Sequence, residues 1–380
     1  MDIINFLKEN PYYLILILFG ITFLIQVYFY LFYYARILFY KNNKNISTTK
    51  EPVSVIICAR NEEKNLEKNL PLILSQDYPD YEVIVVNDCS EDESEFVLER
   101  LQKKHTHLKV TTIKQDDKFT HNKKLALTIG IKAAKNDILL LTDADCKPES
   151  EQWVNKMQSK FTDQKELVLG YGGYESKKGV LNNLIRFDTL FIALQYFTFA
   201  LAGKPYMGVG RNLAYRKELF FKNKGFAGHH HLESGDDDLF VNQVSNKKNT
   251  AVAISPESVT WSEPESRFKA WFKQKKRHTT TGKLYRAQTK WRLFLEITSR
   301  FFYHILFVLS LILFQELYLY ILALFTFRTI LQLIIFKVTM KRLKEKNLLL
   351  PSLLYEIIMP YLGIAFVVAN IFTTKNNSWR

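Results

Sequence analysis

The segment Asp137-Ile-Leu-Leu-Leu-Thr-Asp-Ala-Asp145 decides the fold class of this chain. Its apolar run, 138–141, predicts a buried strand of a parallel sheet, because such a strand is covered on both faces. The carboxylates of Asp143 and Asp145 follow at the C-terminal end of that strand, where open α/β sheets bind their ligands. Two carboxylates at this edge suit a divalent cation, Mg²⁺ or Mn²⁺. The alternative is an ordinary acidic triplet in a solvated loop.

Two more strands with polar ends are expected upstream. Val53-Ser-Val-Ile-Ile-Cys58 runs into Ala59-Arg-Asn-Glu-Glu63, which opens a predicted amphipathic helix. The second strand, Glu82-Val-Ile-Val-Val-Asn87, ends at Asp88. Strand-to-helix turns of this kind bring polar side chains and helix N–H groups to the sheet edge, which suits a nucleotide. Asp88 has a second interpretation as the cap of a helix that begins near Glu91.

Together, these motifs resemble the GT-A domain of family 2 glycosyltransferases, in the membrane-anchored bacterial form that is distantly similar to polysaccharide synthases. The resemblance covers residues 51–286 and implies a Rossmann-like α/β fold with a mostly parallel sheet. It also implies a nucleoside diphosphate sugar as donor and a divalent metal on its diphosphate. The residues that match the family's nucleotide or metal contacts are Ala59, Asn61, Glu62, Asp88, Asp143 and Asp145. Within this set, Asp143 and Asp145 would hold the metal.

Two further motifs resemble the same family. His121-Asn-Lys-Lys-Leu-Ala-Leu127 is similar to a Gly-Lys-x-x-Ala-Leu pattern whose lysine, Lys123 here, approaches the nucleotide. Its alternative is a solvated lysine in the first turn of a helix. Gly208-Val-Gly-Arg-Asn-Leu-Ala-Tyr-Arg216 resembles a loop that implies substrate contacts at Gly210 and Asn212. Glycines in such a loop permit close approach of the backbone to a ligand, although a plain turn would use them as well.

The catalytic base is expected in Ser234-Gly-Asp-Asp-Asp-Leu-Phe240. An inverting sugar transfer needs one carboxylate to take the proton of the acceptor hydroxyl. The family's Glu-Asp-x-Asp-Leu pattern implies that Asp236 is this base, with Gly235 in the place of glutamate. Asp237 is the alternative if the alignment shifts by one residue. Adjacent aspartates also suit the N-terminus of a helix, where negative charge is favourable.

The segment Trp271-Phe-Lys-Gln-Lys-Lys-Arg-His278 resembles the family's Gln-x-x-Arg-Trp motif. Gln274 and Arg277 are retained, whereas His278 replaces the tryptophan. The resemblance implies that Arg277 stabilises the departing nucleoside diphosphate, since positive groups aimed at developing charge favour such a step. The tryptophan contacts the acceptor sugar in polymer-making members, so His278 disfavours a processive synthase. The same stretch also reads as a basic amphipathic helix on anionic lipid.

Apolar segments flank the GT-A-like region. Tyr12–Phe39 exceeds the roughly 20 residues that span a bilayer. Residues 301–336 predict two short spans joined at Gln315-Glu316, with one long tilted helix as the alternative, and 348–372 predict a last span. Residues 181–202 are also apolar, but a span there would divide the site, so we expect a helix on the sheet or at the membrane surface.

The expected domains are therefore a transmembrane helix with its linker at 1–50, a GT-A domain at 51–290, and a membrane region of about three transmembrane helices at 291–380. Basic residues beside the spans place the GT-A domain in the cytoplasm, at the plasma (inner) membrane. The net charge of +14 indicates membrane lipids as partners, and the soluble part lacks the interleaved basic and aromatic residues that bind nucleic acid.

We therefore predict a membrane-bound, metal-dependent, inverting glycosyltransferase that transfers a sugar to a hydroxyl of a lipid-linked or membrane-surface glycan. A processive polysaccharide synthase of the hyaluronan, cellulose or poly-N-acetylglucosamine type would share every nucleotide motif. A nucleotidyltransferase or a non-catalytic membrane scaffold are further alternatives. The sequence does not distinguish Mg²⁺ from Mn²⁺, and it does not identify the sugar or the acceptor.

Overall fold

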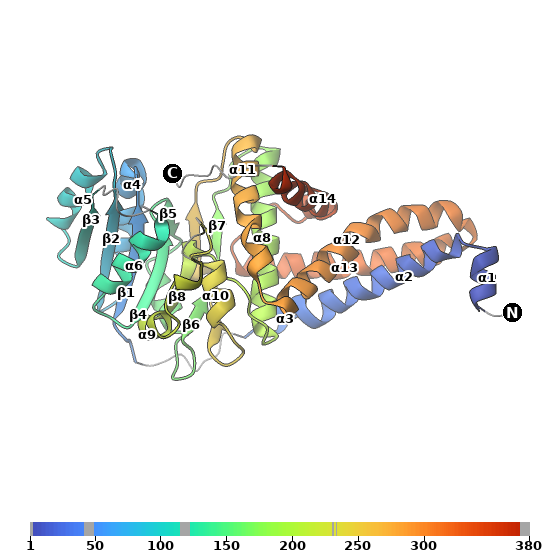
Figure 1. Ribbon diagram of the computed structural model, residues 1–380, viewed down its shortest axis with the longest axis horizontal. Coiled ribbons are helices and arrows are strands. Elements are labelled where there is room, and N and C mark those ends of the chain that lie inside the picture. The colour runs from blue at the N-terminus through green and yellow to red at the C-terminus, as the bar shows by residue number, and fades with distance from the viewer. Residues whose placement is uncertain (1–2, 42–48, 115–121, 230–231, 233, 373–380) are drawn as a thin grey trace.

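The computed structural model describes residues 3–41, 49–114, 122–229, 232 and 234–372. These residues form an α/β domain from which long helices extend on one side (Figure 1). The α/β domain contains the sheet and the helices that cover it, and the long helices come from both ends of the chain.

A seven-stranded sheet with the order β3-β2-β1-β4-β8-β6-β9 organises the α/β domain. The strands are β1 (Val53–Ala59), β2 (Tyr81–Asp88), β3 (Leu108–Ile113), β4 (Ile138–Asp143), β6 (Leu167–Leu169), β8 (Leu213–Arg216) and β9 (Thr250–Val252). The first four are parallel, with Ile56 of β1 opposite Ile84 of β2 and Leu141 of β4. Only β8 runs in the opposite direction to its neighbours β4 and β6. The predicted mostly parallel sheet is confirmed.

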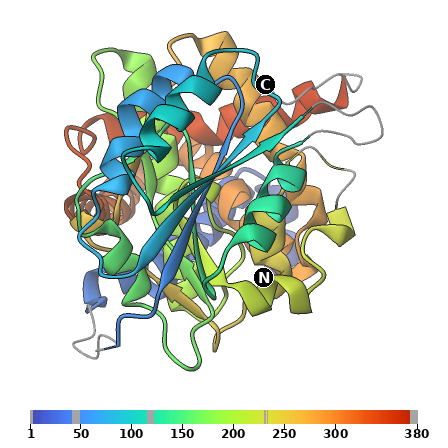
Figure 2. The ribbon, with the colours of Figure 1, turned by 90° about the vertical axis from the view of Figure 1, so that its left-hand side faces the viewer.

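Alternate residues of each central strand face opposite cores. Val55 and Ile57 of β1 face the core formed with α4 (Glu63–Leu74), α5 (Ser94–Gln102) and α7 (Trp153–Gln158). Ile56 faces the other core, formed with α6 (Lys123–Ala133), α8 (Val180–Leu201) and α10 (Asp238–Val244). This arrangement explains the continuous apolar runs, because a strand covered on both faces has no solvent-facing side. Figure 2 shows the helices on both sides of the twisted strands.

A second, three-stranded sheet borders the site. It consists of β5 (Cys146–Pro148), β10 (Thr260–Ser262) and β7 (Gly172–Tyr174), in the order β5-β10-β7. Because β5 begins directly after Asp145, its pairing with β10 fixes the acidic end of β4 beside Ser262. The remaining elements of the α/β domain are η2 (Gly210–Asn212), α9 (Lys217–Lys222), η3 (Ala227–His229), η4 (Pro256–Ser258), α11 (Phe268–Thr279) and η5 (Thr281–Leu284).

In the described part of the chain, five helical segments are long and apolar enough to cross a membrane, by length and composition. The first combines α2 (Tyr13–Tyr28), the π-helical η1 (Phe29–Tyr34) and α3 (Arg36–Phe39), and a short helix α1 (Ile3–Glu9) precedes it. The others are α8, α12 (Ala287–Leu313), η6 (Gln315–Leu317) with α13 (Tyr318–Arg342), and α14 (Pro351–Ile371).

The hairpin lies at η6, where Gln315-Glu316 were expected, and one continuous helix is excluded. The expectation of two short spans is wrong, since α12 has 27 residues and α13 has 25. The difference arises because α12 begins with a basic amphipathic stretch that contains Lys290 and Arg292, before the apolar run.

Helix α8 differs from the other four segments. In its most apolar stretch 78% of the residues are buried within the protein, against 28–33% in the others. Helix α8 therefore packs inside the domain, which agrees with the expectation that a span here would divide the site.

Two buried ion pairs connect the long helices to the domain and to each other. Arg186 of α8 donates from Nε to Glu345 Oε2 at 3.0 Å, and Tyr171 Oη donates to Glu345 Oε1 at 2.7 Å. Arg328 of α13 pairs with Glu356 of α14 and donates to Gln26 of α2 at 2.8 Å. Charges that are this deeply buried are costly unless paired, so these contacts define how the helices fit together.

Candidate active site

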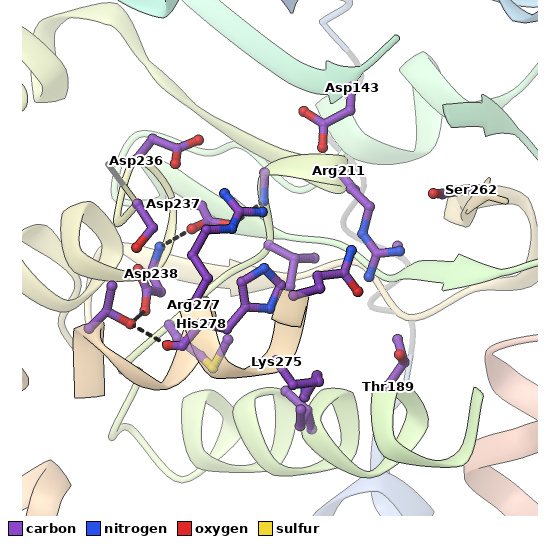
Figure 3. A pocket seen from close by; sticks show the side chains of 18 of the residues that line it. Asp143, Thr189, Arg211, Asp236, Asp237, Asp238, Ser262, Lys275, Arg277 and His278 are labelled. Carbon is purple, nitrogen blue, oxygen red and sulfur yellow. Dashed lines mark hydrogen bonds between the residues drawn. The ribbon is translucent and has the colours of Figure 1, made fainter. Parts of the chain in front are cut away.

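A cavity of about 810 Å³ opens at the C-terminal ends of β1 and β4. Its other walls come from the loop before β8, the start of α10, and helices α8 and α11. Figure 3 shows side chains from these elements converging on one space, with the aspartates of the α10 start on one side and Arg277 and His278 reaching in from α11. This is the sheet edge at which α/β proteins bind ligands.

Lys123 joins two carboxylates from different motifs. It is the first residue of α6, and its Nζ lies 2.6 Å from Asp143 Oδ1 and 3.4 Å from Asp236 Oδ2. Burial disfavours the charged ammonium, but the charges of Asp143 and Asp236 raise the pKa of Lys123 well above its ordinary value. The interpretation of Lys123 as a solvated lysine is therefore wrong. The ammonium group of Lys123 instead lies between the end of β4 and the start of α10.

The three adjacent aspartates have different surroundings. Asp237 caps α10, since its Oδ1 accepts from the N–H of Asp238 at 2.7 Å and its Oδ2 accepts from the N–H of Gly210 at 2.7 Å. Asp238 accepts from Tyr285 Oη at 2.6 Å and from Thr281 Oγ1, and so holds η5. All three aspartates line the cavity, and Asp236 lies beside Lys123, whose Nζ is 3.4 Å from its Oδ2. The helix N-terminus interpretation therefore applies to Asp237 and Asp238 but leaves Asp236 unexplained.

The ionisation of Asp236 and Asp237 also differs. Burial raises the pKa of Asp236, but the charge of Lys123 outweighs it, and the net pKa is below the ordinary value. Burial and the neighbouring charges of Asp236 and Asp238 raise the pKa of Asp237 to about 7. Asp236 is therefore ionised at neutral pH.

A divalent cation could be held at the end of β4. Ligand atoms of Asp143, Asp145 and Cys146 lie within 4.8 Å of one another. Asp145 Oδ2 accepts from Ser262 Oγ at 2.7 Å, which orients the carboxylate. Burial raises the pKa of the Cys146 thiol well above its ordinary value, so the thiol stays protonated and is a poor ligand. The two carboxylates fit Mg²⁺ or Mn²⁺, which prefer oxygen.

Helix α11 closes the opposite side of the cavity. Gln274, Arg277 and His278 all line it. Desolvation in the cavity wall and the charges of Arg277 and Lys275 lower the pKa of His278 well below its ordinary value, so its ring is neutral at pH 7. Lys275 Nζ binds Asp188 Oδ2 of α8 at 2.5 Å, which anchors the helix.

The far end of α11 is attached to α14. Asn370 Nδ2 donates to Lys276 O and to Thr279 Oγ1, both at 2.7 Å, and Trp271 and Phe272 contact Phe366. The last long helix therefore takes part in positioning one wall of the cavity.

Of the other residues predicted to contact the substrate, some line the cavity and others do not. Glu62, at the start of α4, lines the cavity and accepts from Asn65 Nδ2 at 2.6 Å. Gly210 also lines it, with its N–H bound to Asp237. Ala59 is buried in β1 and faces a hydrophobic core. Asn61 adopts a positive φ of 57°, and its Oδ1 accepts from the N–H of Glu91 at 2.8 Å, so it holds two loops together. Neither Ala59 nor Asn61 lines the cavity.

Asp88 and Asn212 also lie behind the cavity wall. Asp88 ends β2 and is fully buried. It does not cap the next helix, which begins at Ser94 and not near Glu91; Asp92 Oδ1 accepts from the N–H of Ser94 instead. Asn212 is fully buried because its amide links three elements: Nδ2 donates to the carbonyls of Tyr171 and Ser258, and Oδ1 accepts from Trp153 Nε1. Its role is structural.

The sequence motifs missed Arg211 and the α8 face. Arg211 stands at the variable position of the Gly-x-Gly-x-Asn loop, lines the cavity, and lies 4.2 Å from the ring centroid of Tyr174. The sequence signal for it was a charged residue between Gly210 and Asn212 in this loop. Asp188, Thr189 and Gln195 of α8 line the cavity as well. With Lys123, Arg277 and Arg211, the cavity offers cations from three elements, which suits an anionic ligand such as a diphosphate.

The chain is similar to known proteins in sequence and in fold. A family model described as "Glycosyl transferase family 21" matches residues 17–380. One curated relative is a "Dolichyl N-acetyl-alpha-D-glucosaminyl phosphate 3-beta-D-2,3-diacetamido-2,3-dideoxy-beta-D-glucuronosyltransferase" of Methanococcus voltae, 30% identical over 178 residues, which are 45% of this chain and 50% of the relative. Another is the "Probable glycosyltransferase YdaM" of Bacillus subtilis, 25% identical over 59% of this chain and 54% of the relative.

The chain thus spans about half the length of these curated relatives. Among solved structures, the mannosyltransferase PcManGT of Pyrobaculum calidifontis, in complex with GDP-Man and Mn²⁺, superposes with a TM-score of 0.63 over 95% of this chain and 99% of that one. At 18% identity this likeness establishes the fold alone.

Proposed function

The chain belongs to glycosyl transferase family 21, and on this premise we propose that it is a membrane-bound, inverting glycosyltransferase that uses a nucleoside diphosphate sugar. The observation that carries the proposal is the position of Lys123 between Asp143 and Asp236. Lys123 contacts both Asp143, which is expected on the diphosphate, and Asp236, which is expected to act as the base. Both residues line the same cavity.

Asp143 and Asp145 would hold Mg²⁺ or Mn²⁺, and the cation would neutralise charge on the diphosphate. Two observations support this site: the carboxylates converge at one strand end, and the likeness of fold extends to a transferase bound to GDP-Man and Mn²⁺. Lys123 and Arg211 add positive charge on the same side of the cavity.

Asp236 would take the proton of the acceptor hydroxyl as its oxygen attacks the anomeric carbon. The new glycosidic C–O bond then forms while the bond from the anomeric carbon to the diphosphate oxygen breaks. The pair of electrons of that bond leaves with the nucleoside diphosphate, which Arg277 stabilises from α11. His278, neutral and exposed to the cavity, is suited to contact an uncharged acceptor sugar.

The acceptor would be a lipid-linked or membrane-surface glycan. The cavity wall includes Thr189, Ile192 and Gln195 of the buried helix α8, and it also includes Leu293 of α12, a segment that could cross a membrane. A relative whose name specifies a dolichyl phosphate-linked sugar as acceptor supports the same class. The chain would be a multi-pass protein of the plasma membrane with its site in the cytoplasm, divided at 1–50, 51–290 and 291–380.

The test is a screen of nucleoside diphosphate sugars with detergent-purified protein in Mn²⁺ or Mg²⁺. We expect the wild type to bind one donor and to hydrolyse it slowly, with release of the nucleoside diphosphate. The variant Asp145→Ala should lose both the binding and the release. Asp80→Ala, which removes an exposed carboxylate, is the matched control. Folded protein that binds no donor would contradict the proposal. With membrane extracts as acceptor, a single added sugar supports it, and a polymer ladder would identify a processive synthase instead.

A further inference from the structure

A second cavity, of about 360 Å³, lies where the first long helical segment joins the sheet domain. Four lysines line it, and we call it the lysine cavity: Lys41, Lys160, Lys165 and Lys247. Among the described residues, none of the 13 that line it is acidic. Ser159, Thr162 and Thr250 add hydroxyl groups. Ammonium and hydroxyl donors without carboxylates are suited to a phosphate.

The walls of the lysine cavity are tightly held. Tyr40, one residue past α3, donates from Oη to Val252 O of β9 at 2.9 Å. Arg342, the last residue of α13, donates to Tyr40 O at 2.7 Å. Lys165 Nζ donates to the carbonyls of Lys247 at 3.3 Å and Thr250 at 2.9 Å. Neutral carbonyl groups therefore hold the ammonium group of Lys165 in position. Because they do not neutralise its charge, the ammonium group can attract an anion.

Burial reinforces this attraction. It lowers the pKa of Lys165, and burial together with the charge of Lys156 lowers the pKa of Lys160. Lowered pKa values mean that the surroundings oppose positive charge here, so an anion in the cavity would stabilise both ammonium groups.

An apolar surface leads to the lysine cavity along the first helical segment. Leu24, Tyr28 and Phe32 are exposed at four-residue spacing, which places them on one helix face. Phe39, 78% exposed, directly precedes Tyr40 and Lys41. In Figure 1 this segment, α2 and α3, runs from the extended helices into the sheet domain. Polar donors at the end of an exposed apolar helix face are what a phospholipid requires.

We propose that the lysine cavity binds the phosphate of an anionic phospholipid whose acyl chains lie along the exposed face of α2 and η1. The site is separate from the catalytic cavity and does not depend on the proposed transfer reaction. Charge selects the headgroup, and the apolar face distinguishes a lipid from a free phosphate.

The test is native mass spectrometry of the whole detergent-purified chain, with phosphatidylglycerol and phosphatidylcholine added in equal amounts. We expect the wild type to retain phosphatidylglycerol preferentially. One lysine near an anionic headgroup contributes about a factor of five in binding, so the double variant Lys41→Gln, Lys247→Gln should bind about 30-fold more weakly. The control variant Lys103→Gln, Lys104→Gln removes two exposed lysines at the end of α5, remote from the long helices, and should bind normally.

A further variant separates lipid from free phosphate. Phe39→Ser should weaken phosphatidylglycerol retention, and millimolar inorganic phosphate should not displace the lipid. Equal retention of the two lipids, or equal losses in both lysine variants, would overturn the proposal. Displacement by inorganic phosphate with no effect of Phe39→Ser would also overturn it, in favour of a free-phosphate site. Unchanged thermal unfolding of each variant verifies that it is folded.

Discussion

Replacing Asp236 by asparagine should lower activity far more than replacing Asp237, although the two residues are adjacent and both line the cavity. Asp236→Asn removes the carboxylate that faces the cavity beside Lys123, 3.4 Å away. Loss of a general base lowers a rate by about 10²- to 10⁴-fold, which corresponds to roughly 3–5 kcal/mol.

Asp237→Asn should be much milder. Asn caps a helix about as well as Asp, so the bond from the N–H of Asp238 can persist. The bond from the N–H of Gly210 would be lost, because the amide nitrogen that replaces Oδ2 cannot accept it, at a net cost of about 0.5–1.5 kcal/mol. We expect activity within about tenfold of the wild type, since this cost corresponds to at most about a factor of ten.

The assay is the initial rate of nucleoside diphosphate release at saturating donor and metal, with donor affinity measured separately by calorimetry. Donor affinity should be similar in both variants, because the base acts on the acceptor. An inactive Asp237→Asn beside a nearly normal Asp236→Asn would refute the reasoning and place the base one residue later. A large loss of donor affinity in Asp236→Asn would instead mean that Asp236 acts by positioning Lys123.

Three other predictions concern charge. Lys123→Met removes the cation that lowers the pKa of Asp236, so that pKa should rise and the acidic limb of the pH–rate profile should move to higher pH; an unmoved limb would exclude Asp236 as the titrating base. Glu345→Ala leaves the buried charge of Arg186 without its carboxylate partner and should destabilise the protein by about 3–5 kcal/mol. The control Lys344→Ala breaks an exposed pair and should cost under about 1 kcal/mol. Equal shifts of the two variants in thermal unfolding would contradict this prediction. The pKa of Asp237 rises from 3.8 to about 7 on folding, so between these pH values the folded protein binds a proton that the unfolded chain has released. The free energy of unfolding should therefore decline from about pH 4 to pH 7. Asp237→Asn should flatten that decline in thermal scans across this pH range.

The sheet and one side of the cavity could be predicted because their signals are local. Continuous apolar runs indicate strands covered on both faces, and polar residues at the ends of β1 and β4 must meet at one edge. The same logic brought Glu62 and Asp143 to the cavity wall. Lys123 begins the helix that packs against these strands, so its position follows from the order of the elements.

The remainder depends on side-chain direction and on contacts between distant elements. A motif does not specify which of two neighbours points inward: Arg211 enters the cavity, while Asn212 turns into the core to bond three elements. Whether Asp88 caps a helix depends on where α5 begins. The helix begins at Ser94, whose N–H donates to Asp92. The contact of Asp188 with Lys275 requires α8 to lie under α11, which no local pattern encodes.

The attachment of α11 to α14 has a consequence for the order of assembly in the cell. Asn370 follows its partner Lys276 by 94 residues. At about 5–20 residues per second, the ribosome adds that stretch roughly 5–20 s after α11. During this interval the sheet, the acidic strand end and Lys123 can already be folded, while the wall that carries Arg277 still lacks its support. A newly made chain should therefore acquire donor affinity before it acquires full catalytic competence, which follows only when α14 has docked.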